Sequence, residues 1–167
     1  MRILLLIKRF NFGGSENHIC DLANELAKRG HNVFLLGRPG QQNQRLNPLV
    51  RFYPFYMRDV AFIPHMFFLQ KFIRRHDIEI IHAHQRLAIK YAAFAGLLSS
   101  TPTAASVHGK TRNDLGGYFC RKLLSRVIFV SNHVLRCAMR FRDLRNKSTF
   151  IPNGVNPVSY THLTLPT

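Results

Sequence analysis

Acidic side chains are scarce in this sequence. Only 8 of its 167 residues are Asp or Glu, against 24 Lys and Arg, which gives a formal net charge of +16. An excess of this size indicates an anionic partner, and nucleic acid, an acidic membrane surface and a phosphorylated substrate all fit it. The charge alone does not choose among these three.

Cysteine is scarce as well. The three cysteines, Cys20, Cys120 and Cys137, lie far apart and form no CxxC pair. This spacing excludes the usual zinc patterns and does not support a framework of disulfides. We therefore expect a protein of the reducing cytoplasm.

Long apolar runs are missing too. The apolar run at the N-terminus ends at Lys8, which is too short for the apolar core of a signal peptide. No stretch approaches the roughly 18 apolar residues of a membrane span. We expect a soluble chain, or one that rests on a membrane without crossing it.

Three nucleotide and hydrolase motifs are absent. Gly13 and Gly14 are adjacent, no third glycine follows as GxGxxG requires, and Gly37 and Arg38 stand where an acidic residue would bind a ribose. These absences disfavour a nicotinamide dehydrogenase. Without GxxxxGK[ST] or GxSxG, neither a P-loop enzyme nor a hydrolase elbow is supported.

Short apolar runs do alternate with amphipathic segments, and 46% of the residues are hydrophobic, enough for the core of one domain. The predicted strands are 2–7, 31–37, 49–55, 78–83, 103–107, 126–130 and 148–151. The predicted helices are 15–29, 60–76, 85–98, 113–124 and 131–143, with Ser131 as a cap and 38–48 as a loop. The alternation predicts an α/β fold: a Rossmann-like parallel sheet with helices on both faces.

Ligands of such sheets bind outside the carboxyl ends of the strands. The loops 8–14, 82–85, 108–111 and 131–132 are expected to share that edge. In the first, two glycines lead from a strand into a helix that begins at Ser15. This arrangement aims backbone N–H groups and a helix dipole at one point, which suits a phosphate or carboxylate. A tight turn without a ligand is an equal alternative.

Histidines stand at two of these strand ends. His108 can donate a hydrogen bond to a sugar hydroxyl or transfer a proton, and the alternative is a histidine bonded to nearby backbone. His82 and His84 are expected to face opposite sides of the sheet, which argues against a shared metal ion. We expect no metal site.

The segment 51–76 mixes aromatic and basic side chains. They are Phe52, Tyr53, Phe55, Tyr56, Phe62, Phe67, Phe68 and Phe72 with Arg51, Arg58, Lys71, Arg74 and Arg75. Such a mixture can dock on an anionic bilayer. The alternative is a strand and a helix packed on the sheet with a solvated basic face, and we favour it for Phe68 and Phe72.

Six stretches, in the same order, resemble the N-terminal part of retaining GT-B glycosyltransferases of the family-four type. They are GGSE (13–16), ANELAKRGHNV (23–33), IIHAH (80–84), SVHGK (106–110), VIFVSN (127–132) and IPNGV (151–155). The resemblance implies two Rossmann-like domains across a cleft. The N-terminal one mainly binds the acceptor, and the other holds most of a nucleotide-sugar donor.

The resemblance also implies roles for individual residues. Gly13 and Gly14 would approach the phosphates of the donor, and His108 would be the catalytic residue near the transferred sugar. The substrate-binding residues would be Glu16, His18, His84, Gly109 and Lys110. No metal or other cofactor is expected, because basic side chains and helix dipoles would stabilise the departing diphosphate.

The chain departs from the family after residue 156. Residues 158–167, VSYTHLTLPT, do not resemble the family's continuation, and its EX7E motif has no counterpart. We interpret 1–156 as the acceptor-side domain, 157–167 as a short, non-native tail, and the donor-binding domain as absent. The expected function is half of a hexosyltransferase for a lipid-linked or cell-envelope saccharide, inactive alone. Its expected location is the cytoplasm, peripheral on the inner face of the membrane.

Two alternatives stay open. A basic nucleic-acid-binding module would explain the charge, although the sequence has no RNP aromatics, zinc ligands or helix-turn-helix signal. A flavodoxin-like interaction domain would explain the fold, with a glycine loop that binds nothing.

Overall fold

The structure, a computed structural model, describes residues 1–109 and 115–154. Its centre is a parallel sheet of seven strands in the order β3-β2-β1-β4-β5-β6-β7. The strands are β1 (Arg2–Arg9), β2 (Asn32–Arg38), β3 (Arg51–Pro54), β4 (Ile80–His84), β5 (Thr103–Val107), β6 (Arg126–Phe129) and β7 (Ser148–Phe150).

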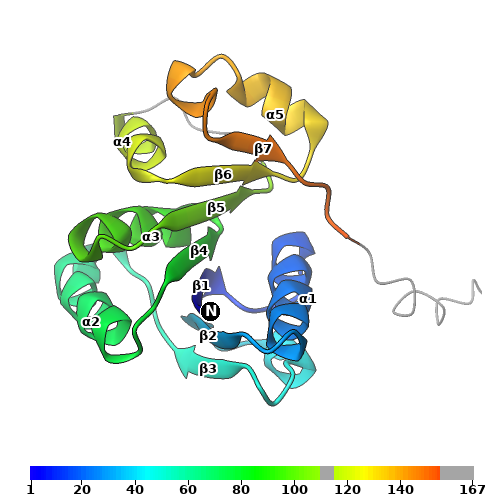
Figure 1. Cartoon of the computed structure of the whole chain (residues 1–167), viewed down its shortest axis with the longest axis vertical. Coiled ribbons are helices and arrows are strands. Elements are labelled where there is room, and N and C mark those ends of the chain that lie inside the picture. Colours follow the sequence, from blue (N-terminus) through cyan, green and yellow to red (C-terminus); the bar gives the residue numbers. More distant parts are fainter. Residues whose placement is uncertain (110–114, 155–167) are drawn as a thin grey trace, which may run out of the picture.

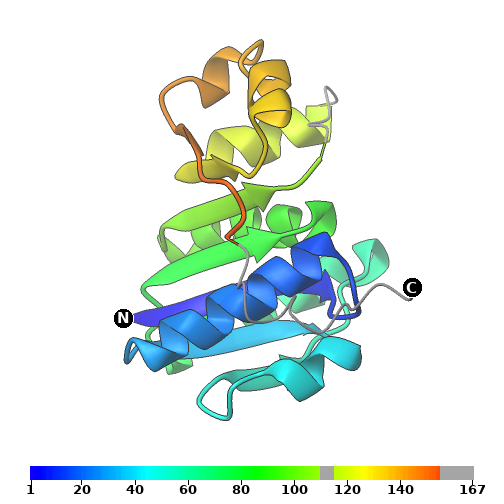
Figure 2. The same ribbon diagram turned by 90° about the vertical axis from the view of Figure 1, so that its right-hand side faces the viewer.

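Five α-helices flank the sheet. They are α1 (Gly14–Lys28), α2 (Phe62–Arg75), α3 (Arg86–Ser99), α4 (Leu115–Leu123) and α5 (Asn132–Ala138). The helices α1 and α5 lie on one face of the sheet, and α2, α3 and α4 lie on the other (Figure 1). Figure 2 shows α1 lying across the strands on its own face. The prediction of a Rossmann-like layer with helices on both faces is confirmed.

Strand β1 is buried on both faces because its side chains alternate between two hydrophobic clusters. Leu4 and Leu6 join the cluster under α2 and α3. Ile3, Leu5 and Ile7 join the cluster under α1. The continuous apolar run at the start of the sequence therefore predicts the central position of this strand.

Helix α1 ends where the sequence predicts, just before Gly30. This glycine has a positive φ of 81°, a conformation that residues with a Cβ rarely adopt. The N–H of Gly30 bonds to the carbonyl of Ala27, and the N–H of His31 to that of Leu26. These two bonds are the Schellman arrangement, which satisfies the last carbonyls of the helix and turns the chain into β2.

The structure differs from the predicted bounds by one or two residues at several ends, and three differences have an identifiable physical reason. Strand β1 runs on to Arg9, because Arg9 pairs with Arg38 after an irregularity in the register. The segment predicted as loop contains a 3-10 helix, Gln41–Arg45.

The third difference is α5, which ends at Ala138, and Ser131 makes no side-chain cap bond. A second short helix, Arg142–Leu144, follows, because the chain turns there to bury Phe141 and Leu144 in the cluster around β6.

Candidate functional site

The carboxyl ends of the strands meet at one edge of the sheet, because all seven strands are parallel. Residues 8 and 9 lie in β1 and residues 82–84 in β4, so the residues that follow the strands at this edge are 10–13 after β1, Gln85 after β4, His108 after β5 and Ser131 after β6. The predicted convergence at one edge is thus confirmed for the described residues. Lys110 and residue 111 lie outside them.

The two glycines of the first loop have different surroundings. Gly13 precedes α1 and caps it without a side chain, and its carbonyl accepts the N–H of Asn17 at 2.8 Å. A Cβ on Gly13 would lie 2.5 Å from the Glu16 carboxylate, whereas a Cβ on Gly14 would meet nothing within 4 Å. A ligand can therefore reach the backbone at Gly14 directly, while at Gly13 the Glu16 carboxylate must first turn away.

The Glu16 carboxylate is held at the amino end of α1, where the helix dipole favours negative charge. Ser15 Oγ donates to Glu16 Oε2 at 2.6 Å, and Gln85 Nε2 donates to Glu16 Oε1 at 2.8 Å. Gln85 Oε1 accepts the N–H groups of Lys8 and Arg9 at 3.1 and 3.3 Å. One amide side chain thus joins the end of β1 to the start of α1.

The sequence placed Gln85 in a loop at this edge but predicted no role for its side chain. It has a φ of +69°, a conformation rare for a residue other than glycine, and it immediately precedes α3. Its position directly after the IIHAH stretch was the available signal. In this conformation its side chain reaches the backbone of Lys8 and Arg9 and the Glu16 carboxylate.

Three imidazole rings gather beside this loop, from three different elements. The ring of His18 on α1 lies with its centroid 5.4 Å from that of His84 and 5.4 Å from that of His108. His84 Nδ1 and His108 Nε2 are 3.2 Å apart and share a hydrogen bond. The side chain of His84 is completely buried. The structure therefore brings His18, His84 and His108 together, and Glu16 lies near enough to act on the charge of His108.

The prediction that His82 and His84 face opposite sides of the sheet is wrong. Their rings lie 4.6 Å apart. Side chains alternate along a strand, so residues two apart share a face, while Ile81 and Ala83 point to the other one. His82 Nε2 is bonded to Ser106 Oγ at 2.9 Å, which adds a fourth imidazole to the cluster.

Burial and mutual proximity keep these imidazoles neutral. Burial lowers the pKa of His82 to about 4, and the nearby rings of His18 and His108 add to the effect. The pKa of His84 is lowered well below its usual value for the same reasons. Burial also lowers the pKa of His18 and of His108, against opposing effects of Asp21 and Glu16 respectively. The cluster is a set of neutral donors and acceptors at pH 7.

The described residues include no group of three or more His, Cys, Asp or Glu side chains arranged to hold a metal ion. In the histidine cluster, Nδ1 of His84 and Nε2 of His108 are engaged with each other. Gly109 is exposed, and a Cβ there would meet open space. Burial raises the pKa of the Cys20 thiol to about 11.

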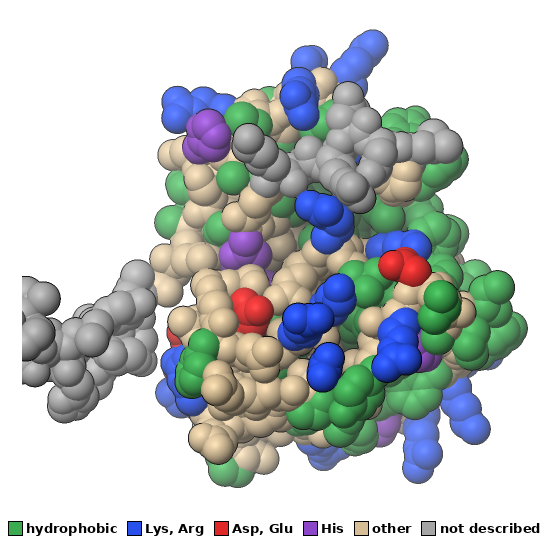
Figure 3. Space-filling view, turned by 180° about the vertical axis from the view of Figure 1, so that it is seen from behind, with side chains coloured by type: hydrophobic (Ala, Val, Ile, Leu, Met, Phe, Trp, Pro, Cys, Tyr) green, Lys and Arg blue, Asp and Glu red, His purple; other side chains and the backbone are tan. Residues whose placement is uncertain are grey.

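On the face of the molecule seen in Figure 3, basic side chains are spread widely and acidic ones are few. Several of the acids are already paired, as in Asp21 with Arg45 and Asp59 with Lys90. Few acidic side chains remain to balance the other basic ones, and the net charge of +16 attracts anionic ligands to the molecule as a whole.

The outer side of α2 is the second candidate surface. Ile63 and Phe67 are exposed to 70% and 68%, and Phe68 to 45%, whereas Phe72 is buried. The packed interpretation thus holds for Phe72 and only partly for Phe68. Of the other aromatic residues in this segment, Tyr56 is also exposed.

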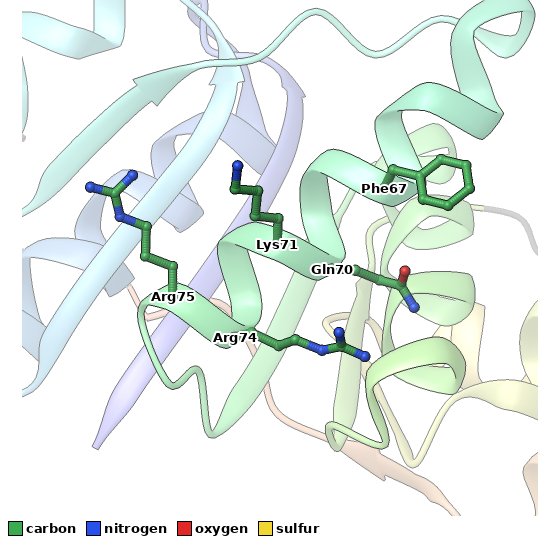
Figure 4. A pocket seen from close by; sticks show the side chains of 5 residues that line it. All are labelled: Phe67, Gln70, Lys71, Arg74 and Arg75. Atoms are coloured by element: carbon green, nitrogen blue, oxygen red, sulfur yellow. The ribbon is translucent and has the colours of Figure 1, made fainter.

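A shallow hollow lies on this side of α2. It is lined by Phe67, Gln70, Lys71, Arg74 and Arg75 (Figure 4). Because α2 leads into the amino end of β4, its last turn lies away from the carboxyl edge that holds the histidines. The hollow and the histidine cluster are separate places. No helix in the described part of the chain is long and apolar enough to cross a membrane.

The sequence was compared with protein families and with known proteins. The family model for glycosyltransferase family 4 matches residues 12–158. The chain belongs to this family. No curated protein sequence matches it.

Solved structures share the fold of this family 4 chain. A glycosyltransferase from Rickettsia africae ESF-5 matches with a TM-score of 0.79 and 16% identity over 93% of this chain and 44% of that one. Anabaena HepE in complex with UDP-glucose matches with a TM-score of 0.75 and 16% identity, over 93% of this chain and 44% of HepE. MurG of Acinetobacter baumannii matches with a TM-score of 0.68 and 11% identity, over 93% of this chain and 46% of MurG. The family 4 chain thus spans less than half the length of these proteins.

Proposed function

We propose that this chain is the N-terminal, acceptor-side half of a retaining glycosyltransferase. The complete enzyme would move a sugar from a nucleotide-sugar donor to a lipid-linked or cell-envelope saccharide. Membership of family 4 supports the reaction class, and solved structures more than twice as long support a second domain. The donor class is supported by HepE, which has been solved with UDP and with UDP-glucose.

The observation that carries the proposal is the convergence at the carboxyl edge of the sheet. The open backbone of Gly14 begins α1, and one turn further along this helix the ring of His18 lies 5.4 Å from that of His108. Backbone N–H groups and a helix dipole bind phosphate, and a neutral imidazole bonds to a hydroxyl. A molecule with a sugar next to a diphosphate would use both.

In this proposal Gly13 and Gly14 face the diphosphate and His108 contacts the transferred sugar as the catalytic residue. Glu16, His18 and Gly109 would contact the substrate, and the buried His84 would act from behind them. A substrate-binding role for Lys110, which lies outside the described residues, stays a prediction from the sequence. No metal takes part, and basic side chains and helix dipoles stabilise the departing diphosphate. Most contacts with the nucleotide would come from the second domain, so the chain alone would bind the donor weakly.

The test is a titration of the isotope-labelled chain with UDP-glucose, followed by NMR. Saturable shifts are expected for the amide of Gly14 and the ring of His108. His108→Ala should weaken binding while the rest of the spectrum stays that of a folded protein. The matched control is His133→Ala, because His133 is exposed on α5, outside the cluster.

Random-sequence duplex DNA serves as the competing ligand. If the chain binds DNA with a steep salt dependence and ignores UDP-glucose, the nucleic-acid alternative replaces the proposal. We also expect little or no sugar transfer by the 167-residue chain alone. Robust turnover would contradict the assignment of essential donor contacts to a second domain.

We further propose that the outer side of α2 rests on an anionic membrane. Its exposed apolar residues, Ile63 and Phe67, lie one helical turn apart, and Lys71 and Arg74 continue the same side toward the end of the helix. Rings at headgroup depth with cations over lipid phosphates are the usual arrangement of an interfacial helix. This would place the enzyme on the inner face of the cytoplasmic membrane, where lipid-linked acceptors are found.

Vesicle sedimentation tests this surface. The chain should bind vesicles that contain phosphatidylglycerol and not those of phosphatidylcholine alone. Each basic residue near such a surface contributes about 1 kcal/mol, so Lys71→Gln with Arg74→Gln should weaken binding roughly ten- to thirty-fold. Arg29→Gln with Arg136→Gln removes the same charge from exposed positions elsewhere. An equal loss with both pairs would mean that only net charge matters.

A further inference from the structure

The hydrogen bond between His84 and His108 raises the question of which ring donates. Each neutral imidazole carries one N–H, on either Nδ1 or Nε2, and the bond joins Nδ1 of His84 to Nε2 of His108. Either His84 donates from Nδ1, or His108 donates from Nε2. The two arrangements leave different groups on the outer nitrogens of the pair.

The surroundings of His84 decide between them. Its other nitrogen, Nε2, is buried and has no hydrogen-bond partner within the described residues. If His108 donated, this nitrogen would carry a buried, unpaired N–H, and such orphaned donors are rare because they lose their bond to water. If His84 donates, the nitrogen keeps only a lone pair, and the sole N–H of the ring is satisfied.

The neutral state of the pair follows from its position. His84 is completely buried, with His82 on one side and His18 and His108 at ring distances of 5.4 and 5.5 Å. A charge on this ring would have no acid beside it and three imidazoles around it. The ring is therefore a neutral donor with one permitted orientation of its proton.

We propose that His84 is a positioning residue that donates its Nδ1–H to Nε2 of His108 and so holds His108 as the neutral Nδ1–H tautomer. His108 then offers one donor and no free acceptor nitrogen. It can donate to an oxygen of the sugar, and it cannot act as a general base until the bond to His84 breaks. The hydrogen bond from His108 to the sugar rests on the proposed function, whereas the tautomer of His108 does not.

Histidine 15N shifts of the ligand-free chain test this directly, because they distinguish Nδ1–H, Nε2–H and imidazolium. At pH 7.5 the expected result is Nδ1–H for both His84 and His108. An Nε2–H on His108 in the unmodified chain overturns the proposal without any variant being made.

Two substitutions separate positioning from packing. His84→Asn retains an N–H donor close to the place of Nδ1 and should keep His108 as Nδ1–H. His84→Leu retains bulk without a donor, and His108 should move to Nε2–H. The control, His82→Leu, removes an equal ring from the same face of β4 and should leave the tautomer of His108 unchanged.

An unchanged tautomer in His84→Leu overturns the proposal, and so does a changed one in His84→Asn. If His84→Leu does not fold, the unmodified chain and His84→Asn still decide. The UDP-glucose titration is scored separately. The expected tautomers together with no binding of UDP-glucose would overturn the proposed function and leave the positioning role in place.

Discussion

Strand β4 has two sides with opposite chemistry. Toward α2 and α3 it presents Ile81 and Ala83, which are completely buried among aliphatic and aromatic side chains. Toward α1 it presents His82 and His84, which pack against other imidazoles and a serine. The first side holds the helices on the sheet, and the second holds polar groups in fixed positions. Stability and the proposed chemistry therefore depend on alternate residues of one strand.

A substitution in the core on the apolar side of β4 should have the largest effect on the free energy of unfolding. Leu69 on α2 is completely buried, and Leu69→Ala should lower the free energy of unfolding by about 2–5 kcal/mol, because it removes buried area and leaves a cavity. Urea denaturation measures this. Phe67→Ala on the same helix changes an exposed ring and should cost less than about 0.5 kcal/mol. Equal losses would show that α2 is not anchored by its inner side.

A smaller effect is expected where α3 approaches β5 closely. A Cβ on Gly96 would lie 2.2 Å from Thr103 Cγ2 and 2.8 Å from the carbonyl oxygen of Thr101. Gly96→Ala should therefore cost roughly 1–3 kcal/mol in urea denaturation, because helix and strand must move apart. Gly109 on the polar side has open space, so Gly109→Ala is the control and should be nearly neutral. A neutral Gly96→Ala would mean that the contact is looser than described.

The histidines on the polar side of β4 should make the free energy of unfolding depend on pH. The unfolded chain binds protons on its histidines near pH 6.5, while the folded chain holds the pKa of His82 at about 4 and lowers those of His18, His84 and His108. Between these values the unfolded state binds more protons, so stability must fall as pH falls.

From pH 7.5 to pH 5, His82 alone should account for a loss on the order of 1–2 kcal/mol in the free energy of unfolding, measured in urea. Asp21 and Glu16 oppose part of the effect at His18 and His108. His82→Leu should flatten the dependence, whereas His133→Ala should not. A stability independent of pH in this range would mean that the histidines titrate as they do in water.

The sequence predicted the sheet because its strands are short apolar runs and its helices carry apolar stripes. All seven strands and five helices lie near the predicted positions, and β5 has the predicted bounds, residues 103–107. The errors are at ends, such as Ala138, where tertiary contacts of Phe141 and Leu144 outweigh local preference. Residues 113 and 114 of the fourth predicted helix lie outside the described residues.

The site was predicted less completely. His108 and Gly14 could be located because each follows an apolar strand, and parallel strands bring their ends together. Gln85 could be placed at the same edge, but the role of its side chain could not be predicted, because it comes from bonds to Lys8 and Glu16, which are distant in sequence. The roles of these residues in binding or catalysis stay predictions.

The amino-acid sequence by itself determined the family, the order of strands and helices, and the basic character of the surface, because these depend on composition, periodicity and local motifs. Only the tertiary structure decided that His18, His84 and His108 touch, and that the Glu16 carboxylate covers Gly13. Contacts of this kind join residues far apart in the chain, and their distances follow from how the sheet is packed. No local pattern contains that information.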